Sequence, residues 1–233
     1  MLDFAGYGPE LLKGAWVTMQ VAFLSLFLAV ALGLLGATAK LSHNPFWKGF
    51  ATLYTTIIRG VPDLVMMFII FFGGQQALNI FFEYLYDNYE IDYFINVNEF
   101  IAGVITIGFI YGAYMTETFR GAFLAVDNGQ IEAGKAYGMS RGQIFLHISF
   151  PLMMRHALPG LGNNWQVLLK TTALVSVIGL TDMVRVATEA SKAEHAPFKF
   201  FIPVVTVYLL LTWISEFIIK KLDAKYSVGV LKH

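Results

Sequence analysis

The chain has 233 residues, of which 57% are hydrophobic and 14% are charged, and its formal net charge at pH 7 is zero. Soluble domains carry about 25% charged residues, so this composition indicates that a lipid bilayer solvates much of the apolar surface. The chain contains no cysteine, which excludes disulfides, thiolate nucleophiles and cysteine metal sites. The balanced charge argues against a nucleic-acid partner, because that role usually shows as a basic excess.

Five apolar segments predict five transmembrane helices of an all-α membrane protein, at residues 15–39, 51–72, 100–115, 153–178 and 201–219. The first carries no charge and is too long for the apolar region of a signal peptide. Asp3 and Glu10 precede it instead of a basic run, so we expect it to be retained. No repeat or low-complexity linker divides the chain, so we expect one transmembrane domain over residues 1–233.

The distribution of Lys and Arg predicts the orientation. Ten of the sixteen cations fall in residues 40–50, 120–155 and 220–233, whereas residues 74–99 contain five acids and no cation. Loops rich in Lys and Arg stay in the cytoplasm. We therefore expect the N-terminus outside, the C-terminus in the cytoplasm, and residues 74–99 as an outer loop.

One cytoplasmic stretch, residues 127–151, is polar and rich in glycine although apolar spans flank it on both sides. It carries the signals of two short helices. Asp127 or Asn128 can cap the first helix, Glu132 is the acid in its first turn, and Gly138 can end it. Ser140 can cap the second helix. Ala133 and Tyr137 share a helical face. Physical reasoning alone leaves two uses open, docking into a soluble partner or a simple turn back into the membrane.

The same stretch resembles the EAA loop of ABC importer permeases. That pattern reads E-A-A, three residues, Gly, nine residues, Ile, one residue and Leu-Pro. Here it appears as Glu132-Ala133-Gly134, Gly138, Ile148 and Phe150-Pro151, with Gly134 and Phe150 as the departures. The resemblance implies that residues 127–151 form a coupling helix that sits in a groove of a partner ATPase, through Glu132, Ala133, Gly134, Tyr137 and Gly138.

Further stretches at residues 55–65, 109–123, 157–180 and 226–230 resemble polar amino-acid permeases, and most of all those for histidine, lysine, arginine and ornithine with their arginine and opine relatives. The resemblance implies a type I (MetI-like) fold in the bacterial inner membrane. It also implies a second permease, often a sister protein, two ATPase subunits that bind ATP and Mg²⁺, and a periplasmic binding protein. This chain would then have no catalytic residue, metal or cofactor of its own.

Ionisable groups at membrane depth are expensive, so each is a candidate for function. Arg59 and Asp63 are spaced i, i+4 and could pair with each other, or Asp63 could contact substrate. Glu117 lies near Tyr114 in the third span, and an isolated carboxylate there needs a cation. A basic amino acid would supply one, and a gate or a helix-packing role is the alternative.

In the fourth span, Asn163, Gln166 and Lys170 are spaced i, i+3 and i+7 and share a face. That face could line a pathway and bind the α-carboxylate and α-ammonium groups of an amino acid. Hydrogen bonds between helices would satisfy the amides equally well. Lys170 could instead pair with Asp182 or Glu189.

The sequence thus favours a permease subunit of an ATP-driven importer for basic amino acids. The alternatives are a permease for another polar amino acid or an opine, and a secondary transporter driven by an ion gradient, although we find no repeat of the kind such carriers often show. A membrane enzyme is a third class, but the sequence shows no Walker A loop and no catalytic motif.

Overall fold

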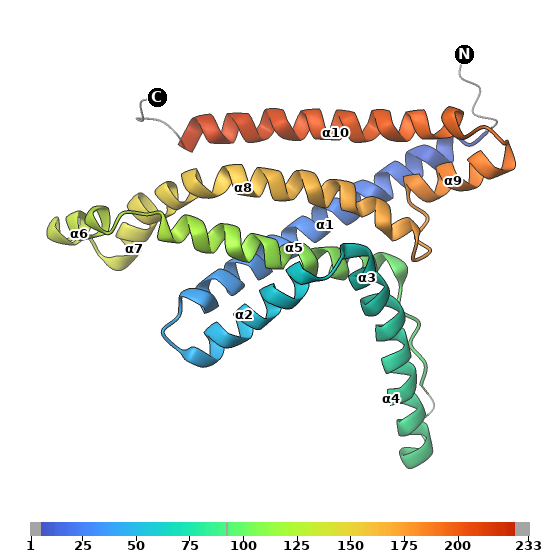
Figure 1. The fold of residues 1–233 in the computed structure, drawn as a ribbon, viewed down its shortest axis with the longest axis horizontal. Coiled ribbons are helices and arrows are strands. Elements are labelled where there is room, and N and C mark those ends of the chain that lie inside the picture. The colour runs from blue at the N-terminus through green and yellow to red at the C-terminus, as the bar shows by residue number, and fades with distance from the viewer. Residues whose placement is uncertain (1–5, 92, 227–233) are drawn as a thin grey trace.

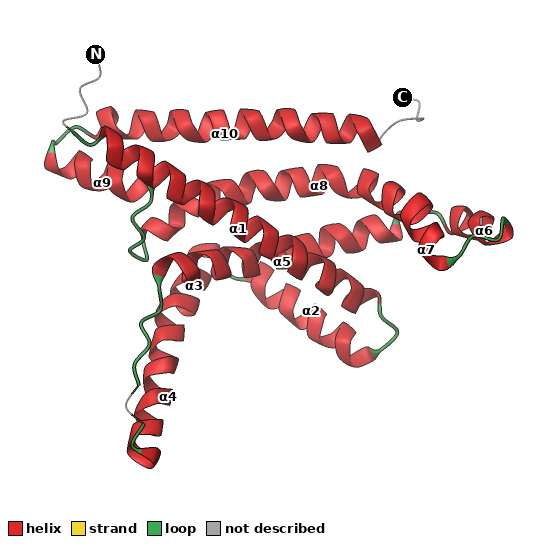
Figure 2. Cartoon of the chain, turned by 180° about the vertical axis from the view of Figure 1, so that it is seen from behind, coloured by secondary structure: helices red, strands yellow, loops and turns green. Residues whose placement is uncertain are grey.

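The computed structural model describes residues 6–91 and 93–226, and every regular element within them is a helix (Figure 2). Of the tail motif at 226–230, only Tyr226 lies inside the described residues. The α-helices are α1 (Gly8–Leu41), α2 (Pro45–Gly60), α3 (Asp63–Phe68), α4 (Gly74–Tyr89), α5 (Glu99–Leu124), α6 (Asn128–Ala136), α7 (Arg141–Ile144), α8 (Phe150–Thr171), α9 (Met183–Ala193) and α10 (Pro197–Tyr226). Short π-helical turns at Ile69–Gly73 and Phe145–Ser149 join α3 to α4 and α7 to α8, and a 3₁₀ turn, Thr172–Ser176, ends α8.

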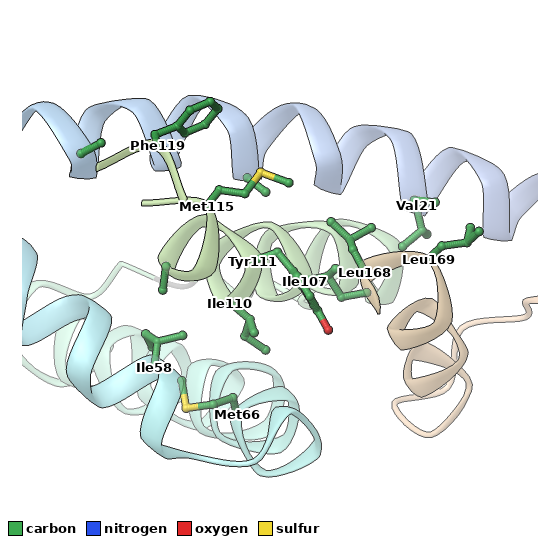
Figure 3. Packing of buried hydrophobic residues seen from close by; sticks show 14 of the residues in the cluster. Val21, Ile58, Met66, Ile107, Ile110, Tyr111, Met115, Phe119, Leu168 and Leu169 are labelled. Atoms are coloured by element: carbon green, nitrogen blue, oxygen red, sulfur yellow. The ribbon is translucent and has the colours of Figure 1, made fainter. Parts of the chain in front are cut away.

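The centre of the fold is the crossing of α1 and α5, which small residues bring close together. A Cβ added at Gly36 of α1 would lie 2.2 Å from Thr116 Oγ1, and one at Gly112 of α5 would lie 2.8 Å from Leu32 Cβ. Glycine at both positions therefore permits the close approach that helix packing in a membrane relies on. Val21, Met115 and other apolar side chains fill the remaining contact (Figure 3).

Four helices within the described residues are long and apolar enough to cross a membrane by length and composition: α1, the continuous helix at residues 63–89, α5 and α10. The expected spans at 15–39, 100–115 and 201–219 fall inside α1, α5 and α10. The helix α8 is not among the four, since its sequence carries charges and amides. It nevertheless runs alongside α5 and α10 (Figure 1).

The expected span at residues 51–72 is wrong as one helix, because the chain breaks between α2 and α3. Val61 is extended, with φ −112° and ψ 138°, and Pro62 follows it. The residue before a proline is pushed out of the helical region, and the proline lacks the N–H that a continuous helix would need. After the break, α3 packs against α5, and α4 then leaves the bundle at a steep angle (Figure 1).

The expected outer loop at 74–99 is also wrong in part, since Gly74–Tyr89 is helical. The segment 93–98 runs back along α4 and is tied to it through Gln75, whose amide nitrogen donates to Ile95 O at 2.9 Å. The side chain of Gln75 also accepts from Val97 N at 2.7 Å. These two bonds hold the segment 93–98 against α4.

At the opposite end of α1 from its loop to α2, α9 packs against both α1 and α10. Asp182 caps α9 by accepting from Arg185 N at 2.9 Å, and its side chain is fully buried. Burial raises the pKa of the Asp182 carboxyl to about 6, because the ionised form is poorly solvated there.

Candidate functional site

A cluster of three charges lies where the last turn of α1 meets α5. Glu117 of α5 contacts Lys40 of α1 through Oε1, and it accepts from Arg120 Nε through Oε2 at 2.9 Å. The side chains of Lys40 and Glu117 are 11% and 20% exposed, so the pair is largely withdrawn from solvent. From its sequence context, Glu117 was expected to be an isolated carboxylate. That was wrong, because tertiary packing brings a cation from a residue 77 positions away.

An open pocket of about 340 Å³ adjoins this cluster, between the end of α1, α2 and α5. Its lining includes Lys40, Glu117 and Tyr114, together with Thr55, Thr56 and Arg59. The guanidinium of Arg59 lies 5.3 Å from the centre of the Tyr114 ring, a cation–π contact. The pocket thus presents a carboxylate, two cations, hydroxyls and an aromatic ring.

A second polar group lies deeper, where α3, α5 and α8 meet. The Tyr111 hydroxyl donates to Asp63 Oδ2 at 3.1 Å and lies 2.6 Å from Thr171 Oγ1. Asp63 is the first residue of α3, where the positive end of the helix dipole favours a carboxylate. Tyr111 belongs to the buried cluster and its hydroxyl is visible at the end of a stick in Figure 3.

The hypothesis that Arg59 pairs with Asp63 is not supported by the geometry. Spacing i, i+4 makes neighbours only within one helix, and the break at residues 61–62 separates the two. Arg59 instead contacts Tyr114, and Asp63 contacts Tyr111. Across the described residues, Asp63 belongs to no ion pair.

The three residues of α8 selected for their shared face lie away from the core. Asn163 and Lys170 are exposed and Gln166 is half-buried, whereas Leu168 and Leu169 point inward. The amide between helices is Asn164, which donates to Thr118 Oγ1 of α5 at 3.0 Å. The suggested partners of Lys170 are engaged elsewhere, since Asp182 caps α9 and Glu189 pairs with Arg185 at 2.9 Å.

Sequence reasoning missed three residues of these polar groups: Lys40, Tyr111 and Thr171. Lys40 looked like an ordinary loop cation that ends a span. Tyr111 and Thr171 were not singled out, because neither carries a charge within the membrane spans. A signal existed for Tyr111 and Thr171, which lie in the stretches 109–123 and 157–180 that resemble known permeases.

The polar stretch at 127–151 folds as two helices, as expected from its caps. Asp127 caps α6 by accepting from Gly129 N at 2.8 Å. Gly138 has φ +75° and follows the end of α6, a conformation that favours glycine. Ser140 and Gln143 then form a reciprocal capping box that starts α7.

The two faces of this hairpin differ. Gly134 is buried against α7 and the turn after it, so that a Cβ at Gly134 would lie 2.8 Å from Ile148 Cδ1. Glu132 and Ala133 are exposed, and Tyr137 is 89% exposed. The hairpin, which extends beyond the end of the bundle in Figure 1, therefore presents an unpartnered face of small and aromatic side chains.

Comparison with known proteins bears on both regions. Residues 29–228 match the family described as "Binding-protein-dependent transport system inner membrane component". The chain is 51% identical over 225 residues to the histidine/lysine/arginine/ornithine transport system permease protein HisQ of Salmonella typhimurium strain LT2, covering 97% of this chain and 96% of that protein. It is 36% identical over 226 residues to the arginine ABC transporter permease protein ArtQ of Escherichia coli K12, covering 92% and 94% respectively.

Among solved structures, the fold is similar to one described as a crystal structure of an amino acid ABC transporter with histidines. The TM-score is 0.79 at 29% sequence identity, and the match covers 96% of this chain and 98% of the other. The similarity therefore extends over the bundle, the break between α2 and α3, and the polar hairpin.

Proposed function

This chain belongs to the family of binding-protein-dependent transport system inner membrane components, and from that premise we propose that it is the permease subunit of an ATP-driven importer for basic amino acids. It is a multi-pass protein of the bacterial inner membrane. One relative is named for the transport of histidine, lysine, arginine and ornithine, and another for the transport of arginine. The polar groups at membrane depth agree with a charged cargo.

We propose that the whole chain forms one type I (MetI-like) transmembrane domain with five spans: α1, α2 with α3, α5, α8 and α10. The similar amino acid transporter fold supports this assignment. The polar sequence of α8 is compatible with it, because α8 packs against α5 and α10 instead of relying on lipid alone. The bias of Lys and Arg supports an outer N-terminus and a cytoplasmic C-terminus.

The subunit is proposed to work with a second permease, which would be a sister protein, with two ATPase subunits and with a periplasmic binding protein. ATP and Mg²⁺ would be bound by the ATPases, and this chain would carry no catalytic residue, metal or cofactor. The exposed side of the hairpin, Glu132, Ala133 and Tyr137, would dock into the ATPase. Gly134 and Gly138 would hold the hairpin in the shape that docks.

For the substrate, the observation that carries the proposal is the carboxylate of Asp63. It lies at membrane depth with a tyrosine hydroxyl as its polar contact and, among the described residues, with no cation beside it. A carboxylate in that setting is open to a cationic ligand, because ionisable groups within a membrane are usually paired. Glu117 already has two cations, so a substrate cation reaches it only by exchange.

The remaining candidates would contact the other groups of the amino acid. Tyr114 lines the pocket beside Glu117. Gln166, Asn163 and Lys170 share the outward face of α8, where they can meet the α-carboxylate and α-ammonium groups when the second permease completes the path. Amides supply both donors and acceptors for these groups.

The test is uptake into proteoliposomes that contain this chain with its partner permease, ATPase and binding protein. Labelled arginine, lysine, histidine and glutamine would be compared with ATP inside and without it. Asp63→Asn keeps the size of the side chain and should lower arginine uptake at least tenfold, with basal ATP hydrolysis retained. Asp87→Asn is the matched control, since Asp87 is exposed on α4 away from the bundle.

The two alternatives have distinct outcomes in the same assay. Uptake driven by a proton or sodium gradient without ATP would identify a secondary transporter and refute the importer. ATP-driven uptake of glutamine or an opine in place of the cationic set would leave the importer standing and refute the substrate class.

A further inference from the structure

The two cations on Glu117 are not equivalent. Lys40 and Glu117 both line the pocket beside α2, whereas Arg120 is not among the lining residues. Lys40 contacts Oε1 and Arg120 contacts Oε2, so each oxygen of the carboxylate has its own cation. A molecule in the pocket therefore meets the Lys40 side of the carboxylate, while Arg120 can keep its contact from the other side.

The two cations also differ in how they are held. Arg120 is three residues from Glu117 on the same helix, so its pairing is local to α5. Lys40 reaches across from the last turn of α1, which ends at Leu41 and is followed by a turn. A lysine has a flexible four-carbon stem and a compact ammonium, so it can leave and return without movement of the backbone.

We infer that Lys40 is a tethered competitor of the cargo: it occupies the cation position on Glu117 when the pocket is empty, and a basic amino acid enters by displacing it. This inference rests on the proposed substrate class. Arg59 lies on the same pocket and can receive the α-carboxylate of the amino acid whose side chain takes the place of the Lys40 ammonium.

Exchange of one cation for another explains discrimination in physical terms. When a guanidinium or ammonium replaces Lys40, Glu117 stays neutralised and Lys40 moves toward water at the end of α1. When a neutral amino acid enters, it offers Glu117 no charge, and displacing Lys40 would leave a buried carboxylate half-compensated. The pocket thus admits a cation at low net cost and rejects an uncharged analogue of similar size.

The exchange also limits affinity. A cargo that must first displace Lys40 binds more weakly than it would to a free carboxylate oxygen, and this weak binding suits a site that has to release its ligand. Removing the competitor should therefore tighten the binding of a basic amino acid. A purely structural ion pair predicts the opposite, since its loss would loosen the contact of α1 with α5 and disorder the pocket.

The experiment measures binding of labelled arginine to the detergent-purified complex of both permeases and the ATPase, without binding protein and without ATP. Lys40→Met removes the competing charge at similar length and should tighten arginine binding about five- to tenfold. Lys40→Arg supplies a stronger competitor, because the planar guanidinium matches the geometry of a carboxylate better than an ammonium does. This variant should therefore weaken arginine binding. Lys48→Met is the matched control: Lys48 is an exposed lysine of α2 that does not line this pocket, and its loss should change nothing.

Two further arms make the result decisive. The gain in Lys40→Met should disappear in the double variant Lys40→Met/Glu117→Gln, because the oxygen that was freed no longer carries charge. Labelled glutamine should gain less than arginine does in Lys40→Met, because it offers the freed carboxylate oxygen no charge. An unchanged or weaker arginine affinity in Lys40→Met, or a Lys40→Arg variant that binds arginine as well as the wild type, would overturn the competition.

The proposed function has a separate readout, uptake into proteoliposomes that also contain the binding protein. Wild-type proteoliposomes that fail to import arginine with ATP would refute the substrate class. Wild-type import together with unchanged affinity in the Lys40 variants would refute only the role of Lys40. If Lys40→Met fails to assemble, the Lys40→Arg variant still decides the question through the sign of its effect.

Discussion

The glycine that ends α6 gives a sharp test of the hairpin as a coupling element. Gly138 has φ +75°, and a Cβ built there would meet nothing within 4 Å. A side chain at this position is therefore penalised by the backbone conformation alone, not by a clash. For alanine that penalty is about 1–2 kcal/mol, which corresponds to roughly a 5- to 30-fold shift in the local equilibrium between the native turn and its alternatives.

The turn it protects is held by two backbone bonds, from Gly138 N to Lys135 O at 2.9 Å and from Met139 N to Gly134 O at 3.1 Å. Gly138→Ala weakens both, so we expect ATP-driven uptake to fall several-fold while the complex still assembles. Uptake by Gly138→Asn should lie between that of the wild type and that of Gly138→Ala, because asparagine tolerates the left-handed region better than alanine does.

Gly142→Ala is the matched control for this series. Gly142 lies in the first turn of α7, its Cβ position is also open, and its φ is not in the left-handed region. The assay is uptake into proteoliposomes together with co-purification of the ATPase. Wild-type uptake by Gly138→Ala would refute the argument that the rigid turn transmits the movement of the ATPase.

Two predictions concern stability in detergent, which would be followed by intrinsic fluorescence because the chain has no cysteine for thiol dyes. Gly36→Ala should lower the unfolding temperature, since its Cβ would lie 2.2 Å from Thr116 Oγ1 and overpacking costs about 1–3 kcal/mol, whereas Gly49→Ala, with nothing within 4 Å, should not. Burial raises the pKa of Asp182 to about 6, so the folded state favours its protonated form. The resulting stabilisation, at most about 3 kcal/mol, is present below pH 4 and is lost as the pH rises to 6. The unfolding temperature should fall over that range, and Asp182→Asn should flatten the slope; equal slopes in both proteins would contradict the assignment.

The polar hairpin shows how far local sequence signals reach. The sequence offered Asp127 or Asn128 as the first cap, Gly138 as the stop and Ser140 as the second cap. The structure uses Asp127, Gly138 and Ser140 in these roles. Capping depends on a side chain and backbone groups within three residues, so the information is contained in the stretch itself. Its place in the permease family likewise followed from spacing along the chain.

The second span shows where local reasoning ended. Residues 51–72 were expected to form one span, but the chain breaks before Pro62, and α4 leaves the bundle. A proline removes a hydrogen bond wherever it occurs, yet the size of the bend depends on what packs on each side of it. Spacing i, i+4 then lost its meaning for Arg59 and Asp63, and with it the expected pair.

The sequence by itself determined what depends on composition and on near neighbours: a membrane protein, the long apolar helices, the caps and turn of the hairpin, and the family. Only the tertiary structure decided which distant side chains meet. Lys40 reaches Glu117 across 77 residues because glycines at the crossing of α1 and α5 let those helices approach closely. Tyr111 lies between Asp63 and Thr171 because α3, α5 and α8 meet there. The sequence shows that a carboxylate within the membrane needs a partner. Which residue becomes that partner depends on how the helices pack, and no local sequence pattern predicts it.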